Sequence, residues 1–242
     1  MSSHSDSASS ILDEIVCRGV AIDVFHADQA RRLLEEIDGY VEVINETGLG
    51  KVFFGNLQRI LEWDLCLSLT RLFERYSSQN PNRSIGAAIH FISSHAGELR
   101  IPNRARLIDF LVGRDRSHLS LDTLEDKQLS LAVVQKLREG LPTADSSSEN
   151  ALDQALANLK RVRDKAIAHH DRVDKASLMV PAWPKLVELV EFSRQFVLLV
   201  ATSYLSVSHN LEYDAGRSAS SLRQLLEKAG LTPGPAGGGD PA

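Results

Sequence analysis

Apolar residues recur at spacings of three and four along most of this chain, which is the period of an amphipathic helix. That spacing predicts helices over 12–24, 28–46, 84–96, 102–112, 126–138, 181–207 and 218–229. No stretch alternates apolar and polar residues in the way that indicates a β-strand. The pattern therefore predicts an all-α fold, a single-domain bundle of long helices with short peripheral helices.

The segment 51–76 is apolar on nearly every side of a helix. A helix of that kind is typically central and buried, so we expect it to form the middle of the bundle. Asp64 and Arg71 lie on this helix and would be costly to bury without partners. We expect both to form ion pairs that tie helices together rather than to take part in catalysis.

The two ends of the chain differ in composition from the rest. Residues 1–10 are rich in serine, which predicts a disordered lead. Residues 230–242 are rich in glycine and proline, which predicts a flexible tail. Residues 11–229 remain as one helical domain, long enough to enclose a sizeable core.

A further helix is predicted to begin at Ser146-Ser-Ser-Glu149, which has the Ser-x-x-Glu form of a capping box. Leu152, Leu156 and Leu159 follow it at spacings of four and three. They form an apolar stripe that enters a core. We expect this helix to continue through Asp171.

The same stripe contains residues that do not belong in a core. At about 100° per residue, Arg163 and His170 fall in its middle and His169 lies at its edge. An arginine cannot be neutralised and is costly to bury unpaired. The stripe must therefore meet a carboxylate, a cleft or a partner surface at the level of Arg163.

The net charge of −5 argues against a protein that coats nucleic acid by charge alone. A nucleic-acid site would need a local basic patch, and one surrounds the two histidines. Its members, besides Arg163, are Lys160, Arg161, Lys165, Arg172 and Lys175. The first four of these are the candidate RNA-binding residues.

Metal, disulfide and membrane sites are not indicated. Cys17 and Cys66 are far apart and lack zinc-ligand spacing, and the side chains of His169, His170 and Asp171 diverge around a helix. We therefore expect no metal and no cofactor. No stretch approaches the roughly 20 uninterrupted apolar residues that span a bilayer, and the N-terminus lacks the features of a signal peptide. A cytoplasmic protein without a membrane partner is the expectation.

Arg163-Asp164 followed by Ile167-Ala168-His169 resembles the signature of the HEPN superfamily (higher eukaryotes and prokaryotes nucleotide-binding domains). That signature is an arginine, a polar residue after it, and a histidine after four to six intervening positions. Arg163, Asp164 and His169 match these roles, with Asp where Asn is common. The Ala-His-x-Asp ending and the segment 63–73 are similar to the abortive-infection U-type (AbiU-like) branch. The resemblance covers most of residues 20–210.

The resemblance implies a metal-independent endoribonuclease, acting as a toxin or as an abortive-infection effector in phage defence. The nucleophile would be the 2′-hydroxyl of the RNA, with histidine exchanging protons near neutral pH and Arg163 donating to phosphate oxygens. Asp164 would orient Arg163 or a histidine. The resemblance also implies a homodimer whose cleft is built from two copies, with RNA as substrate and a nucleotidyltransferase-type antitoxin as partner.

Two alternatives stay open. The chain could be a non-catalytic HEPN module that binds RNA, a nucleotide or a protein. The two histidines could instead only stabilise the C-terminal end of a helix, where the helix dipole is negative. Within the catalytic interpretation, the family pattern assigns the role to His169, whereas the helical wheel aligns His170 with Arg163. We favour His169, because the motif match does not depend on ideal helix geometry.

Overall fold

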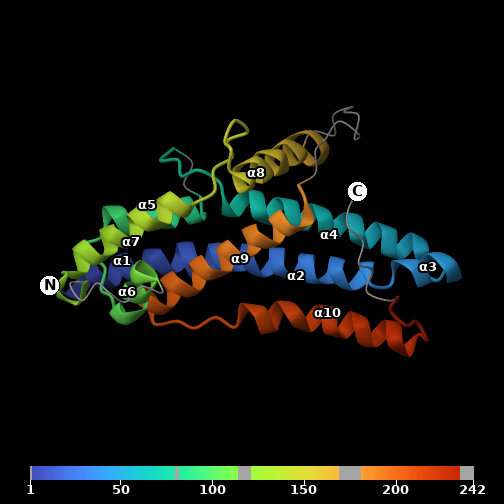
Figure 1. Ribbon diagram of the computed structural model, residues 1–242. Coiled ribbons are helices and arrows are strands. Elements are labelled where there is room, and N and C mark those ends of the chain that lie inside the picture. The colour runs from blue at the N-terminus through green and yellow to red at the C-terminus, as the bar shows by residue number, and fades with distance from the viewer. Residues whose placement is uncertain (1, 80–81, 114–120, 169–180, 235–242) are drawn as a thin grey trace.

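The computed structural model describes residues 2–79, 82–113, 121–168 and 181–234, and these form helices without any strand (Figure 1). The fold class predicted from the sequence is therefore confirmed. In chain order the α-helices are α1 Ser2–Ile15, α2 Ala21–Asp38, α3 Val41–Thr47, α4 Lys51–Leu72, α5 Ile85–Ser94, α6 Arg104–Val112, α7 Asp126–Gly140, α8 Ala151–Val162, α9 Trp183–Val200 and α10 Leu211–Lys228. Short helical pieces of other pitch are the π-helical η1 Val16–Val20, η3 Arg163–Ala168 and η5 Ala201–Leu205, and the 3-10 turn η2 Leu121–Thr123.

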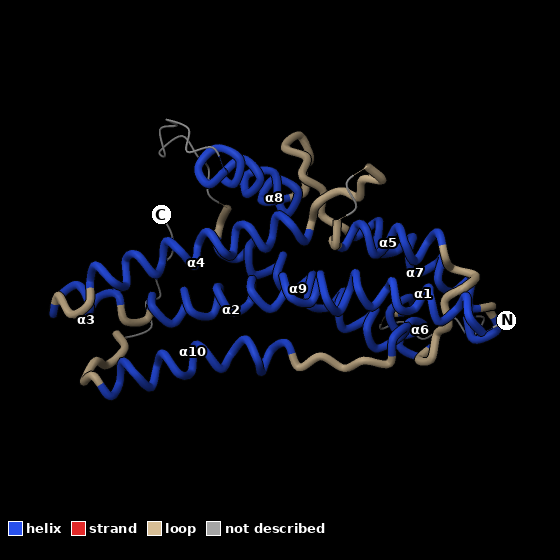
Figure 2. The backbone as a smooth tube through the Cα atoms, turned by 180° about the vertical axis from the view of Figure 1, so that it is seen from behind, coloured by secondary structure: helices blue, strands red, loops and turns tan. Residues whose placement is uncertain are grey.

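Helix α2 lies in the middle of one half of the bundle, the half that contains α4 and α10. It packs between α4 and α10, and α9 packs beside it (Figures 1 and 2). The contacting face of α2 is apolar at helical spacing and buried, with Val24, Ala27, Leu34 and Ile37. Helix α8 packs on the side of α4 that faces away from α10. This stacking places the segment around Arg163 and the helix α10 on opposite sides of α2.

The other half of the bundle is formed by α1, α5, α6 and α7, which gather at the end that holds the N-terminus (Figure 1). The sequence predicted that Ser84 begins a helix. Its Oγ accepts a hydrogen bond from the backbone N of Ala87 at 3.1 Å, and α5 begins at the next residue. That prediction is confirmed, because a capping hydroxyl satisfies a free N–H locally.

The N-terminal segment differs from the expected disordered lead. Residues 2–38 are helical throughout, through α1, η1 and α2. The side chains of Ala8 and Leu12 are buried, and α1 packs against α5. At the other end, Leu231 is buried and the backbone N of Gly234 donates to the carbonyl of Gly39 at 3.1 Å. Ala8 and Leu231, on either side of 11–229, thus both pack against the helical core.

The helix expected over 28–46 is two helices, α2 and α3, separated at Gly39 and Tyr40. The φ angle of Tyr40 is −114°, outside the helical range, and its side chain is buried. The change of direction lets both Ile37 and Tyr40 reach the core. Gly48, with φ of 69°, ends α3 in the left-handed conformation, which glycine adopts readily.

The expectation that 51–76 is buried on every side is wrong. Helix α4 covers α2 with one face, but Val52, Phe53, Ile60 and Trp63 are exposed on another face. Helix α8 packs on α4 near Cys66, whose Sγ donates to the carbonyl of Leu159 at 3.5 Å. The exposed apolar residues precede this contact in α4. The apolar content of α4 alone could not reveal that the first part of this helix lies beyond its contact with α8.

The expected capping box at Ser146–Glu149 is also wrong. Helix α8 begins at Ala151, and the Asn150 side chain accepts from the backbone N of Leu152 at 2.9 Å. The hydroxyl of Ser148 instead donates to Asp153 at 2.7 Å. Ser148 and Asp153 thus hold the preceding loop, and Asn150 caps the helix in place of Ser146.

The partners expected for the charged residues of α4 are present. Arg71 lies 3.0 Å from Asp23 of α2, and Asp64 lies 4.0 Å from His26 of the same helix. Both pairs join α2 to α4. No helix in the described part of the chain has the length and apolar character needed to cross a membrane.

We predict that Leu156→Ala destabilises the protein by about 2–5 kcal/mol, because Leu156 is fully buried where α8 meets the core. Urea denaturation followed by circular dichroism measures the free energy of unfolding. Leu225→Ala is the matched control, since Leu225 is 62% exposed on α10. It should change stability by no more than about 0.5 kcal/mol. Equal effects of the two substitutions would contradict the packing of α8 described above.

Candidate functional site

Arg163 begins the short π-helical piece η3, directly after α8 ends at Val162. The helical wheel assumed an unbroken α-helix through Asp171, and that assumption fails at Arg163. A π turn is wider than an α turn, so residues beyond it are rotated away from the positions that the wheel gives them. Such turns are rare and frequently occur at functional sites.

The guanidinium of Arg163 is oriented by two carboxylates. Its Nε donates to Oδ1 of Asp164 at 2.8 Å, and its Nη1 lies 3.8 Å from Oε1 of Glu74. The side chain is 25% exposed, so it is largely buried but still reaches solvent. The sequence predicted a carboxylate, a cleft or a partner surface beside Arg163. The structure places two carboxylates there, those of Asp164 and Glu74.

Lys160 lies one turn before Arg163 and is half-buried. Its Nζ lies 3.5 Å from the backbone carbonyl of Phe73, at the end of α4. Burial lowers the pKa of Lys160, and the positive charges of Arg163 and Arg75 lower it further. Arg75, Lys160 and Arg163 thus form a compact cationic group, named here the basic cluster, which an anion would stabilise.

Glu74 and Arg75 were not among the predicted site residues. They follow the segment 63–73 directly in the sequence, and that segment carried part of the resemblance. What could have pointed to Glu74 and Arg75 in the sequence is that they directly follow the segment 63–73. Only the packing of α4 against α8 brings them to Arg163, because they lie far from it along the chain.

The other predicted residues fall into two groups. Arg161 and Lys165 are exposed, and neither forms an ion pair within the described part of the chain. His169, His170 and Arg172 lie outside the described residues, so their catalytic and RNA-binding roles stay predictions. The structure therefore brings together Lys160, Arg163 and Asp164 among the predicted residues.

Cys66 lies beside this site and is buried in the core. Burial raises the pKa of its thiol to about 11, so the thiol is protonated at neutral pH. Among the described residues, no three histidine, cysteine or acidic side chains are arranged to hold a metal ion.

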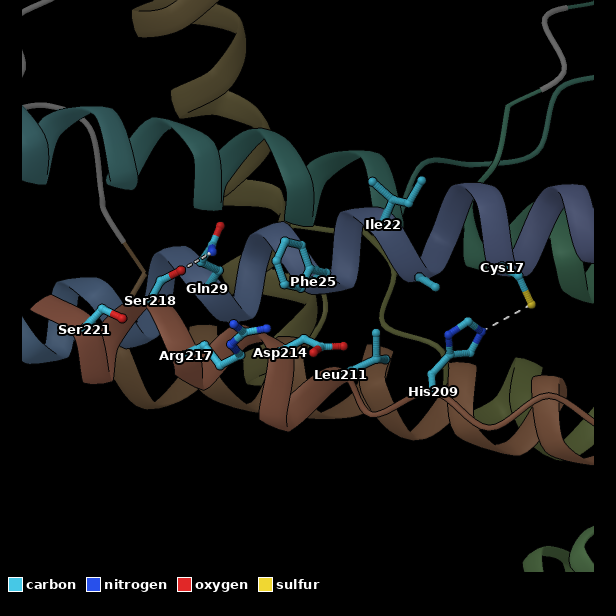
Figure 3. Close-up of a pocket in the computed structure, with 11 residues that line it drawn as sticks. Cys17, Ile22, Phe25, Gln29, His209, Leu211, Asp214, Arg217, Ser218 and Ser221 are labelled. Carbon is cyan, nitrogen blue, oxygen red and sulfur yellow. Dashed lines mark hydrogen bonds between the residues drawn. The ribbon is translucent and has the colours of Figure 1, made fainter.

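A large cavity lies away from this site, between α2 and α10 (Figure 3). Its volume is about 800 Å³, and Phe25, Arg217 and His209 are among the residues that line it. His209 Nε2 lies 3.3 Å from Cys17 Sγ at one end (Figure 3). Burial raises the pKa of Cys17 to about 12, with a hydrogen bond to Asp13 as a further cause. Because only the thiolate is a good nucleophile, this pair is not suited to thiol catalysis at neutral pH.

An all-helical bundle that presents an arginine and a carboxylate ahead of the sequence Ile-Ala-His is of the HEPN class. The model of the HEPN family AbiU2 matches residues 14–228, and the chain belongs to this family. Neither a curated protein nor a solved structure matches the chain. The resemblance to the AbiU-like branch is thereby confirmed.

We predict that Lys160→Met leaves the fold at least as stable near neutral pH. The folded protein disfavours charged Lys160, since its pKa is lowered from 10.5. This cost is present below the lowered pKa and disappears as pH rises from there to 10.5, so any advantage of Lys160→Met should shrink across that window.

Chemical denaturation at several pH values measures this effect. Lys165→Met is the matched control, because Lys165 is exposed on the following turn. Its substitution should change stability little at any pH. A Lys160→Met protein that is clearly less stable than the control near neutral pH would show that Lys160 is favourably paired, against the prediction.

Proposed function

We propose that this protein is a metal-independent endoribonuclease of HEPN type that acts through Arg163 and His169. The observation that carries the proposal is the geometry of Arg163. Asp164 orients its guanidinium, Lys160 adds a second positive charge, and the side chain remains accessible to solvent. Membership of the AbiU2 family supports the same assignment, since Arg163, Asp164 and His169 match the HEPN motif.

The chemistry needs only groups that the chain and the RNA supply. The 2′-hydroxyl oxygen attacks the adjacent phosphorus, and the bond from phosphorus to the 5′-oxygen breaks. One base removes the 2′-hydroxyl proton and one acid protonates the leaving 5′-oxygen, and His169 suits either role near neutral pH. Arg163 donates to the non-bridging oxygens as their charge increases. The products are a 2′,3′-cyclic phosphate and a 5′-hydroxyl.

The two carboxylates beside Arg163 have different roles in this proposal. Asp164, at 2.8 Å from Arg163 Nε, is the orienting residue. Glu74, at 3.8 Å from Arg163 Nη1, forms a looser contact. A phosphate would therefore displace Glu74 and leave Asp164 in place, because the longer ion pair is the weaker one.

One chain offers one Arg163–His169 set, and we propose that two copies complete the site. The exposed apolar face of α4, formed by Val52, Phe53, Ile60 and Trp63, is the surface for the second copy. Arg59 and Glu62 are also exposed on α4. In a symmetric pairing, Arg59 of one copy can meet Glu62 of the other, since both patches are the same surface. Trp63, at one end of this face, lies three residues before Cys66, where α8 packs on α4, so this end of the second copy would be the one nearer Arg163.

As an abortive-infection effector, the protein would be a toxin that cleaves RNA in phage-infected cells. A toxin of this kind needs a partner that keeps it inactive, and we propose a nucleotidyltransferase-type antitoxin. A gene for such a protein next to this one would support the pairing.

The first test is cleavage of end-labelled RNA in the presence of EDTA. Wild-type protein should release fragments with a 2′,3′-cyclic phosphate and a 5′-hydroxyl. Arg163→Ala and His169→Ala should each lose at least about 10²-fold in rate, the low end for positioned acid–base catalysis, and His170→Ala should lose less.

Arg217→Ala serves as the control, because Arg217 is exposed on α10, across α2 from the basic cluster. Fragments that form only with added Mg²⁺ would contradict the mechanism. A larger loss in His170→Ala than in His169→Ala would assign the catalytic role to His170. Wild-type protein that binds RNA without cleaving it would favour the non-catalytic HEPN module.

The second test concerns the dimer. Phe53→Glu should convert a dimer into a monomer, because it places a charge within the proposed apolar interface while Phe53 is 63% exposed in the single chain. Light scattering coupled to size exclusion measures the mass. Leu225→Glu, on the exposed side of α10, should leave the dimer intact. A wild-type monomer at working concentrations would overturn this part of the proposal.

A further inference from the structure

A small cavity of about 190 Å³ lies beside the basic cluster. One wall is the segment 73–76 that follows α4, and another is the loop 141–144 that follows α7. Gly86 of α5 also lines it, and a Cβ at this position would lie 3.3 Å from the carbonyl of Glu74. The absence of a side chain at Gly86 therefore lets the segment 73–76 lie close against α5.

Three lining residues connect the cavity to the basic cluster. Glu74 lies 3.8 Å from Arg163, and the carbonyl of Phe73 lies 3.5 Å from Nζ of Lys160. Arg75 lines the cavity and is close enough to Lys160 to lower its pKa. A phosphate held by Arg163 and Lys160 would thus lie next to the mouth of the cavity.

The cavity offers an aromatic surface. Tyr76 lines it and is 40% exposed. The ring stacks on His90 with centroids 4.0 Å apart and an angle of 16° between the planes. His90 covers one face of the Tyr76 ring and fixes its orientation, so a second planar ring would have to stack on the opposite face. Thr143, at the opposite wall, adds a hydroxyl that can donate or accept.

We propose that this cavity binds one unpaired nucleobase of an RNA strand, from the nucleotide adjoining the phosphate at Arg163. The inference rests on the proposed function and adds to it a subsite for single-stranded substrate. Pockets for whole small-molecule ligands are typically about 300–1,000 Å³, so a cavity of 190 Å³ fits part of a ligand. A nucleotide carries a planar base next to a phosphate. The protein places an aromatic ring next to the basic cluster, so each part of the nucleotide has a suitable partner.

The proposal selects single-stranded RNA. A base that is paired and stacked in a duplex cannot enter a side cavity, whereas an unpaired base can be turned out and stacked on an aromatic side chain. Stacking accepts every base, because each has a π-face. The polar groups of Arg75 and Thr143 would then set the preference among bases.

The experiment measures binding rather than cleavage, so it does not depend on catalysis. The probes are a fluorescent single-stranded oligodeoxyadenylate and an abasic oligonucleotide of the same length, neither of which has a 2′-hydroxyl. Fluorescence anisotropy gives the Kd of each. Wild-type protein should bind the oligodeoxyadenylate more tightly. Tyr76→Ala should reduce that difference about tenfold, because it removes one stacking surface, and should leave the abasic probe unaffected.

Three variants serve as comparisons. Tyr76→Phe keeps the ring and should bind as wild type does. Tyr213→Ala removes a tyrosine that is 63% exposed on α10 and should change neither Kd. Lys160→Met should weaken the binding of both probes equally, because it removes a phosphate contact. If Tyr76→Ala weakens the binding of both probes equally, or of neither, the proposed subsite is wrong. Cleavage of the matching RNA is assayed separately, so its failure would contradict the ribonuclease proposal alone.

Discussion

The burial of α2 between α4, α9 and α10 is the contact on which the rest of the structure depends. Its apolar face is buried in the core, and its polar edge is fixed by ion pairs. Asp28 is almost fully buried and accepts from Arg31 at 2.6 Å and from Arg32 at 3.0 Å. A buried carboxylate needs such partners, because its hydration is lost. With Asp28 paired, α2 can be enclosed along its length.

Helix α2 also fixes the positions of its neighbours. Asp23 pairs with Arg71 of α4, and Glu36 pairs with Arg223 of α10 at 2.6 Å. These contacts set α4 relative to the core, and α8 then packs on the far side of α4 through Leu156 and Leu159. The basic cluster follows from that order of packing, since it forms where the end of α8 meets the end of α4.

The packing of α8 on α4 accounts for a basic cluster on a protein of net negative charge. With a net charge of −5, the chain has no general attraction for nucleic acid, so the proposed binding of RNA would depend on a few closely spaced cations. Arg75, Lys160 and Arg163 provide them, and Asp164 and Glu74 limit their charge while no ligand is present. Partial burial strengthens each of these interactions, because the surroundings are less polar than water.

The sequence by itself determined the elements whose signals are local. Helical spacing gave the all-α class, Ser84 and Gly48 marked helix ends, and Arg163-Asp164 with Ile-Ala-His identified the family. A capping hydroxyl, a left-handed glycine and a motif each act within a few residues, so they can be found without knowledge of the fold. The same local signals were misleading at Ser146, where several polar residues competed to cap one helix.

Only the tertiary structure decided which apolar residues are covered and which charges meet. The exposed face of α4 looked like core in the sequence, because its exposure depends on where α8 lies along it. Glu74 and Arg75 join Arg163 only through the contact of two helices that are far apart in the chain. The π turn at Arg163 likewise cannot be derived from helical spacing. Each of these features is set by non-local packing, on which local sequence patterns carry no information.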